Sequence, residues 1–153
     1  FSKGVGTCGG FVAGSQALID FLVNRCRTYI YSTAIAPPIV AATLAAVDLV
    51  PKLGNRRKRL EEINRRVRDT LAQQGWRVPS GRTPIVPVIV GSSHRALEVS
   101  QELFRAGVLV PAIRPPTVPA EAARLRISLS ATHSDEQLEV LLRALGATAV
   151  MQP

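Results

Sequence analysis

The sequence predicts an α/β protein that ends in a small two-layer domain, with helices packed on one face of a short sheet. From residue 55 on, segments with helical and extended patterns follow each other as helix, strand, helix, strand, strand, helix. In the helical segments apolar residues recur every three or four positions, and in the extended segments they alternate with polar residues. Residues 1–54 do not continue this pattern, and we interpret them as the tail of another domain.

Length and composition are those of a globular protein with anionic partners. The chain has 153 residues, of which 46% are hydrophobic, and a net charge of +8. Cys8 and Cys26 form no C-x-x-C pair, which favours a reducing cytoplasm as the compartment. The sequence opens at Phe1 without Met or a signal-peptide pattern, so we expect that it continues a longer polypeptide.

The first ten residues are rich in glycine. Residues 4–9 read G-x-G-x-x-G, but a dinucleotide fingerprint needs a strand before the glycines and a helix after them. Here a short strand is predicted after the glycines, at residues 11–14. Lys3 also precedes the glycines, which is the wrong order for a phosphate-binding P-loop. The glycines still permit a close approach of the backbone to a ligand beside Lys3.

Two helices are predicted next, separated by an extended segment. Ser15 is a suitable N-cap for a helix that runs to Arg27, and residues 28–33 show the alternation of a strand. Pro37 can begin a helix that is apolar nearly all round as far as residue 50. This helix should be buried in the complete protein and exposed if the 153 residues are taken alone. It is too short to span a bilayer, so no membrane is predicted.

A long helix is predicted for residues 55–74. It has one apolar stripe, ends at Gly75, and is otherwise strongly basic. Such a patch can bind nucleic acid, but acidic residues interrupt it and no aromatic residue lies among the basic ones. We therefore interpret it as a solvated helix face and predict no nucleic-acid partner. The stripe is Leu60, Ile63, Val67 and Leu71, and the basic residues are Arg56, Arg57, Lys58, Arg59, Arg65, Arg66 and Arg68.

The remaining elements complete the small domain. Strands are predicted at residues 84–90, 108–113 and 124–129, with a helix at 92–106 after the first of them. Ser134 to Gln137 form a capping box for a last helix. Its inward residues are Leu138, Leu141, Leu142 and Leu145. His94 and His133 lack partners at metal-ligand spacing, so no metal site is predicted.

A proline-rich segment and the strand after it suggest an anion site. Residues 112–119 contain three prolines, which predict that Arg114 and Thr117 lie on a stiff, extended segment. Arg126 lies on the polar side of the strand at 124–129, where apolar residues occupy the other side. Two guanidinium groups on neighbouring segments suit a carboxylate or a phosphate, because the planar fork binds such anions with two hydrogen bonds.

The sequence resembles a known family in its motifs, and in their order and spacing, over nearly all 153 residues. It is similar to the α-oxoamine synthases, pyridoxal-phosphate enzymes of fold type I, and among them to the 8-amino-7-oxononanoate synthases. The I-R-P-P-T-V-P run favours this branch. The motifs are residues 1–4 with 9–10, 31–33 with 37–38, 113–119, and 124–126 with 131–133.

The resemblance implies a role for each matching residue. Lys3 corresponds to the lysine that binds pyridoxal 5'-phosphate covalently and acts as the acid and base. Ser32 and Thr33 correspond to the pair that reaches the cofactor phosphate of a neighbouring subunit, which implies a homodimer. Arg126 corresponds to the residue that binds the amino-acid carboxylate, and Arg114 and Thr117 to substrate-facing positions.

The resemblance also implies the reaction and the domains. The complete protein would condense L-alanine with a pimeloyl thioester, with decarboxylation, in biotin biosynthesis. Residues 1–54 would be the tail of the large cofactor-binding domain, and residues 55–153 the C-terminal small domain. Other cofactor contacts of the family have no counterpart here, so the 153 residues alone should be inactive. The alternatives are a glycine C-acetyltransferase, a 5-aminolevulinate synthase, or a basic nucleic-acid-binding module without catalysis.

Overall fold

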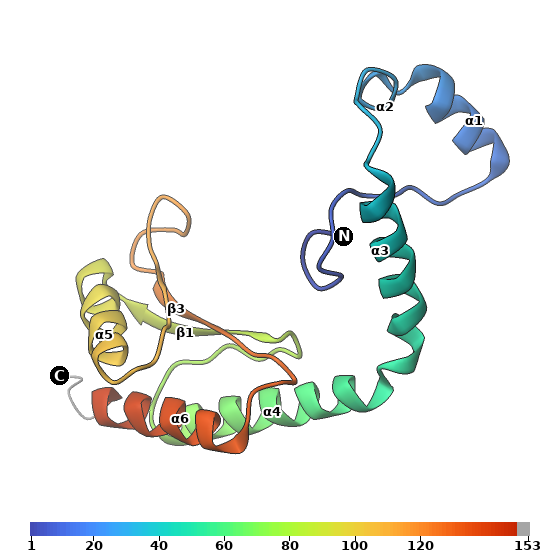
Figure 1. The fold of residues 1–153 in the computed structure, drawn as a ribbon. Coiled ribbons are helices and arrows are strands. Elements are labelled where there is room, and N and C mark those ends of the chain that lie inside the picture. The colour runs from blue at the N-terminus through green and yellow to red at the C-terminus, as the bar shows by residue number, and fades with distance from the viewer. Residues whose placement is uncertain (150–153) are drawn as a thin grey trace. The chain divides into compact units, whose positions relative to one another are not determined.

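The structure, a computed structural model, describes residues 1–149 (Figure 1). They form two compact units, one from Phe1 to Gly54 and the other from Asn55 on. The first unit contains three α-helices and a 3-10 turn, and the second contains three α-helices and a three-stranded sheet. The helices are α1 (Gln16–Arg25), α2 (Arg27–Ile30), α3 (Pro37–Leu49), η1 (Val50–Lys52), α4 (Gly54–Gln73), α5 (Ser93–Arg105) and α6 (Asp135–Ala149), and the strands are β1 (Ile85–Gly91), β2 (Ala112–Ile113) and β3 (Ala123–Ser128).

The second unit is the predicted two-layer α/β arrangement. The sheet is antiparallel in the order β1-β3-β2. One face of the sheet packs against α4, α5 and α6 (Figure 1). Alternate strand residues point into this layer because side chains on a strand alternate between its two faces. The buried strand residues are Val86, Val88, Ala123, Leu125 and Ile127.

The helices bury, in the core of the second unit, side chains that their periodicity predicts to face inward. On α4 the buried side chains include Ile63, Val67 and Leu71, and on α6 all four predicted leucines are buried. The capping box of α6 is present, since Ser134 N–H donates to Gln137 Oε1 at 3.0 Å and Gln137 N–H donates to Ser134 Oγ at 3.3 Å. Gly75 and Gly107 follow α4 and α5 with φ of 87° and 81°, the left-handed conformation that ends helices.

Two polar side chains connect the end of α4 to α6. The indole Nε1–H of buried Trp76 donates to the carbonyl of Leu145 at 3.2 Å, and Gln74 Nε2 donates to the carbonyl of Leu142 at 2.9 Å. A buried indole needs such a partner, because an unpaired donor in the core is destabilising. The turn after α4 is therefore fixed against the last helix.

Asn64 and Arg68 on α4 hold the loop that leads into β1. Buried Asn64 donates to the carbonyl of Thr83 and accepts from Arg68 Nε at 2.6 Å. The other guanidinium nitrogens of Arg68 donate to the carbonyls of Pro79 at 2.5 Å and Ile85 at 3.1 Å. Burial lowers the pKa of Arg68. No pattern in the sequence pointed to this pair, which positions the start of β1.

Ion pairs between α4 and α6 make the stability of the second unit sensitive to acid. Arg59 donates to Asp135 Oδ1 at 2.7 Å, which lowers the pKa of Asp135 below its ordinary value of 3.8, and Arg66 contacts the same oxygen at 3.2 Å. A lowered pKa in the folded state stabilises the fold above the unfolded-state pKa, and this contribution is lost as the pH falls through the folded-state value.

We expect Asp135→Asn to reduce the resistance of the protein to urea at pH 6. The difference from the wild type should shrink below pH 3.8, where the unfolded-state carboxyl is largely protonated. Urea unfolding at pH 6 and pH 3, at low and high salt, would measure both effects. Asp69→Asn is the matched control, because Asp69 forms no ion pair or hydrogen bond within residues 1–149. A loss for Asp135→Asn that is equal at both pH values would contradict the expectation.

The first unit agrees with the predicted helices but not with the predicted strands. Ser15 caps α1 by accepting from Leu18 N–H at 3.3 Å. Residues 11–14 are irregular, and residues 28–33, predicted to be extended, begin with the helical turn α2. In α2 Ile30 N–H donates to the carbonyl of Cys26 at 2.9 Å. The predictions of strands at residues 11–14 and 28–33 rested on their β-rich composition and are wrong. A strand needs a neighbouring strand to pair with, and none of the described strands pairs with either segment.

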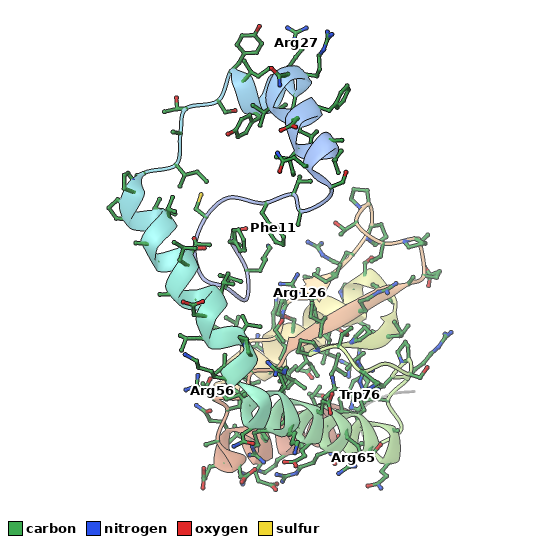
Figure 2. All side chains as sticks on the ribbon, turned by 90° about the vertical axis from the view of Figure 1, so that its right-hand side faces the viewer. Phe11, Arg27, Arg56, Arg65, Trp76 and Arg126 are labelled. Carbon is green, nitrogen blue, oxygen red and sulfur yellow. The ribbon has the colours of Figure 1, made fainter. Side chains whose placement is uncertain are left out.

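Helix α3 begins at Pro37 as predicted, yet none of its residues is buried. Leu44, for example, is 63% exposed, and no residue between 1 and 54 is buried (Figure 2). This exposure is what we expect for the 153 residues taken alone. In the part of the chain that the structure describes, no single helix is long and apolar enough to cross a membrane, although Pro37–Lys52 and Gly54–Gln73 meet that criterion as a bent pair.

Candidate functional site

Lys3 lies in a glycine-rich turn of the first unit. The turn is closed by Gly6 N–H, which donates to the carbonyl of Lys3 at 2.9 Å, and Gly6 has a φ of 71°. The Lys3 side chain is exposed and forms no ion pair or hydrogen bond to any residue between 1 and 149. A primary amine in this position is available to a ligand.

Glycine is required at one position of this loop. Gly9 has a φ of 94°, and a Cβ there would lie 2.6 Å from Cδ1 of Ile35. Two positions earlier, Thr7 contacts α3 by accepting from Thr43 Oγ1, at 2.9 Å between the two hydroxyl oxygens. The loop and the start of α3 border an open, shallow hollow of about 340 Å³. Its lining residues are Gly6, Thr7, Cys8, Pro38, Ile39 and Ala42.

Ser32 and Thr33 lie together in the connection between α2 and α3. Both are exposed. The Ser32 hydroxyl donates to the carbonyl of Thr28, whereas the Thr33 hydroxyl has no hydrogen bond to another residue in the described chain. The start of α3 offers no free amide for an anion, because Pro37 and Pro38 lack N–H groups and the next two amides donate to the carbonyl of Ala36. An anion here can use the hydroxyls of Ser32 and Thr33, which are both exposed.

Arg114 and Thr117 lie in a closed turn, so the prediction of an extended segment is wrong. Thr117 N–H donates to the carbonyl of Arg114 at 3.0 Å, and the Pro115–Pro116 peptide bond inside the turn is cis. The φ that proline imposes suits a turn as well as an extended chain, and the sequence did not distinguish the two. Both residues are exposed, and the turn brings them close to one another.

Arg126 lies on the open face of the sheet, as the alternation of β3 predicts. It pairs with Pro87 of β1, and its N–H donates to the carbonyl of Pro111 at 3.0 Å. Its exposed side chain points away from the helices, on the side of the sheet opposite buried Trp76 (Figure 2). Prolines therefore flank Arg126 on both sides, and the central strand fixes its backbone.

Two further arginines share this open face. Arg124 precedes Arg126 by two positions and pairs with Ile89 of β1 and Ile113 of β2. Arg77 joins the same row through a bridge to Ile89. Arg124 follows the same alternation that predicts Arg126 on the polar side of the strand, whereas no pattern in the sequence pointed to Arg77.

The open face is positive because its arginines lack acidic partners. No Asp or Glu occurs in β1, β2 or β3. Within residues 1–149, Arg77, Arg124 and Arg126 form no ion pair. On the basic helix α4, Arg59 and Arg66 pair with acids of α6, at 2.7 Å in the case of Arg59 and Asp135. Unpaired positive charge thus lies on the sheet as well as on the helix that the composition first suggested.

The histidines do not form a metal site. His133 Nδ1 accepts from Ser130 N–H at 3.2 Å in the turn before α6, and His94 Nδ1 lies 3.4 Å from Glu98 on α5. Among the residues that the structure describes, no group of three or more His, Cys, Asp or Glu side chains could hold a metal ion.

Comparison with known proteins assigns the chain to a family. The sequence profile described as "Aminotransferase class I and II" matches residues 1–145. The chain belongs to this family.

Several relatives within the class I and II aminotransferases are half identical to the chain. A protein of Bordetella pertussis described as "Putative 8-amino-7-oxononanoate synthase" is 50% identical over 147 residues, which are 96% of this chain and 37% of that protein. The "8-amino-7-oxononanoate synthase" of Marinobacter nauticus is 50% identical over 143 residues, 94% of this chain and 36% of that protein. The chain thus spans less than two fifths of the length of these relatives.

Solved structures of class I and II aminotransferase relatives have the same fold. The serine palmitoyltransferase of Sphingomonas wittichii is 32% identical with a TM-score of 0.91, over 100% of this chain and 40% of that one. The 8-amino-7-oxononanoate synthase of Francisella tularensis has a TM-score of 0.82 at 24% identity, over 95% of this chain and 43% of that one, and so shows the fold alone. The fold is that of part of a fold type I pyridoxal-phosphate enzyme, as predicted.

Proposed function

We propose that the full-length protein is a pyridoxal-phosphate-dependent acyltransferase that condenses L-alanine with a pimeloyl thioester, with loss of carbon dioxide, to give 8-amino-7-oxononanoate. One observation carries the proposal: bacterial proteins with this name are about half identical to the chain over nearly its whole length. The fold of the chain and the predicted residues of both units support it. In this proposal residues 1–54 are the tail of the large cofactor-binding domain and residues 55–153 are the small domain.

The residues of the first unit fit pyridoxal 5'-phosphate. The amine of Lys3 is exposed and unpaired, and Thr33 has a free hydroxyl that can donate to a phosphate. Ser32 can donate as well if its hydroxyl leaves the carbonyl of Thr28. When bound, the cofactor supplies an electron sink for a carbanion at the amino-acid Cα. Lys3 Nζ then accepts the proton from this carbon and later returns it.

Arg126 binds the carboxylate of the amino acid in this proposal. Its fixed backbone on the central strand and its unpaired guanidinium suit a bidentate contact. Arg114 and Thr117, in the turn that follows β2, contact the acyl thioester or the product. The cytoplasm remains the compartment that we propose, and we propose no nucleic-acid, membrane or metal partner.

We expect Arg126→Ala in the full-length protein to weaken alanine binding by about 10- to 100-fold, the range for one charge-assisted contact. Arg126→Lys should restore little, because a point charge does not reproduce the fork. Titration of the cofactor absorbance with alanine measures the affinity. Arg114→Ala is the control, and it should leave alanine affinity nearly unchanged while lowering the rate with acyl thioester. The opposite pattern for the two variants would reverse the assignment.

The test of the proposed function is a set of assays of the full-length protein with alanine, glycine or serine and several acyl thioesters. The serine palmitoyltransferase of S. wittichii has the same fold at 32% identity, which makes another enzyme of the α-oxoamine synthase type the second candidate. Glycine C-acetyltransferase and 5-aminolevulinate synthase are the further alternatives. Release of carbon dioxide with alanine and pimeloyl thioester is the expected result. No condensation with any pair of substrates would contradict the proposal.

We also propose a homodimer, because Ser32 and Thr33 can serve the phosphate of a neighbouring subunit only across a two-fold interface. Sedimentation of the full-length protein at several concentrations should show a species at least as large as a dimer. A fully active monomer would contradict this assignment.

A further inference from the structure

The open face of the sheet is partly apolar and partly cationic around Arg124. In the row across the strands, Arg124 lies between Ile89 of β1 and Ile113 of β2, and all three side chains are half-buried. In the next row Arg126 lies between two prolines. The face therefore offers apolar contact beside each guanidinium, which suits a ligand with an aliphatic chain and a charged end.

The guanidinium of Arg124 forms one hydrogen bond through Nε, and its two terminal nitrogens are free of hydrogen bonds to described residues. Its Nε donates to the carbonyl of Ala122 at 2.9 Å, and no carboxylate within residues 1–149 pairs with it. Arg95, which is also half-buried, contacts both Glu98 and Glu102 at 3.5 Å. A half-buried charge without a counter-charge is unfavourable, and the two terminal nitrogens of Arg124 remain available for a bidentate carboxylate.

The spacing along β3 matches the length of a dicarboxylic acyl group. Residues two apart on the same face of a strand are separated by about 7 Å. A seven-carbon diacid has six carbon–carbon bonds of about 1.5 Å, which zigzag to roughly 7.5 Å from one end to the other. If Arg126 holds the amino-acid carboxylate beside the reacting carbon, Arg124 lies within reach of the far end of the acyl chain.

We propose that Arg124 binds the distal carboxylate of the acyl thioester and so selects dicarboxylic over monocarboxylic acyl groups. The methylene chain lies along Ile89 and Ile113, and the terminal nitrogens of Arg124 donate to the two carboxylate oxygens. This inference rests on the proposed condensation of an amino acid with an acyl thioester.

The experiment compares pimeloyl thioester with heptanoyl thioester, which has the same length but no distal carboxylate, as substrates of the full-length protein. The wild type should prefer the pimeloyl group. Arg124→Gln should lower kcat/KM for the pimeloyl substrate by about 10- to 100-fold and change the value for heptanoyl by less than about threefold. Arg143→Gln on α6, where the exposed guanidinium has no ion pair within the described residues, is the matched control and should alter neither value.

Three results would overturn the proposal. The wild type could fail to discriminate between the two thioesters, or Arg124→Gln could lower both values equally, as a purely structural role would. Arg114→Ala could abolish the preference while Arg124→Gln keeps it. A failure of the proposed function looks different, because the wild type would then condense neither thioester with any amino acid.

Discussion

Lys3→Ala in the full-length protein should eliminate the covalent attachment of pyridoxal phosphate and lower the condensation rate by about 10²- to 10⁴-fold or more. The physical reason is that the variant removes both the amine that holds the cofactor and the base at the amino-acid Cα. Borohydride reduction followed by peptide mapping should label Lys3 in the wild type and leave the corresponding peptide of the variant unlabelled.

The sequence offers a matched control for this prediction. The chain contains three lysines, Lys3, Lys52 and Lys58. Lys52 is exposed in the first unit, so Lys52→Ala should keep the label and the rate. A label on Lys52 or Lys58, or a Lys3→Ala variant with the wild-type rate, would refute the assignment of Lys3.

Leu125→Ala should destabilise the second unit by about 2–5 kcal/mol, a large part of the stability of an ordinary domain. Leu125 is 0% exposed and lies on the central strand β3, between β1 and β2 and above the helices. The shorter side chain would leave a cavity that a strand held on both sides cannot close. Hydrogen exchange of peptides that cover β1 and β3 measures the loss as faster exchange in the folded protein.

Leu109→Ala is the control for this prediction, because the same atoms are removed from a side chain that is 81% exposed. It should leave exchange in both strands close to that of the wild type. Equal acceleration by the two variants would mean that the packing around β3 does not determine the stability of the sheet.

The second unit could be predicted closely because its signals are local and agree with its packing. The stripe of α4, the capping box of α6 and the alternation along β3 each indicated an element and the face that it buries. The alternation also placed Arg126 on the open face. What the sequence could not supply is the register across strands, which sets Arg124 between Ile89 and Ile113.

The wrong or missing predictions share one physical cause. The conformation that a segment adopts, and the partners that its side chains find, depend on segments that are packed against it in the folded protein. Residues 28–33 have a composition typical of a strand but no strand to pair with, so local hydrogen bonds form a helical turn. The prolines around Arg114 fix φ without deciding between a turn and an extended chain. Asn64 escaped prediction because its partners, Thr83 and Arg68, come together only in the folded unit.

The edge of the sheet at β1 has little capacity to recruit a second chain and so to start aggregation. Arg126 N–H donates to the carbonyl of Pro111 and so points away from β1. Pro87 of β1, which is paired with Arg126, therefore turns its nitrogen outward, away from β3. Proline has no N–H to donate at this position. The outward N–H of Ile89 donates to the carbonyl of Arg77. Among Ile85, Pro87 and Ile89, only Ile85 keeps an outward N–H without a partner, and its carbonyl already accepts from Arg68. A strand from another molecule would find few N–H groups to accept from at these three positions, which protects the protein while it is newly synthesised and concentrated.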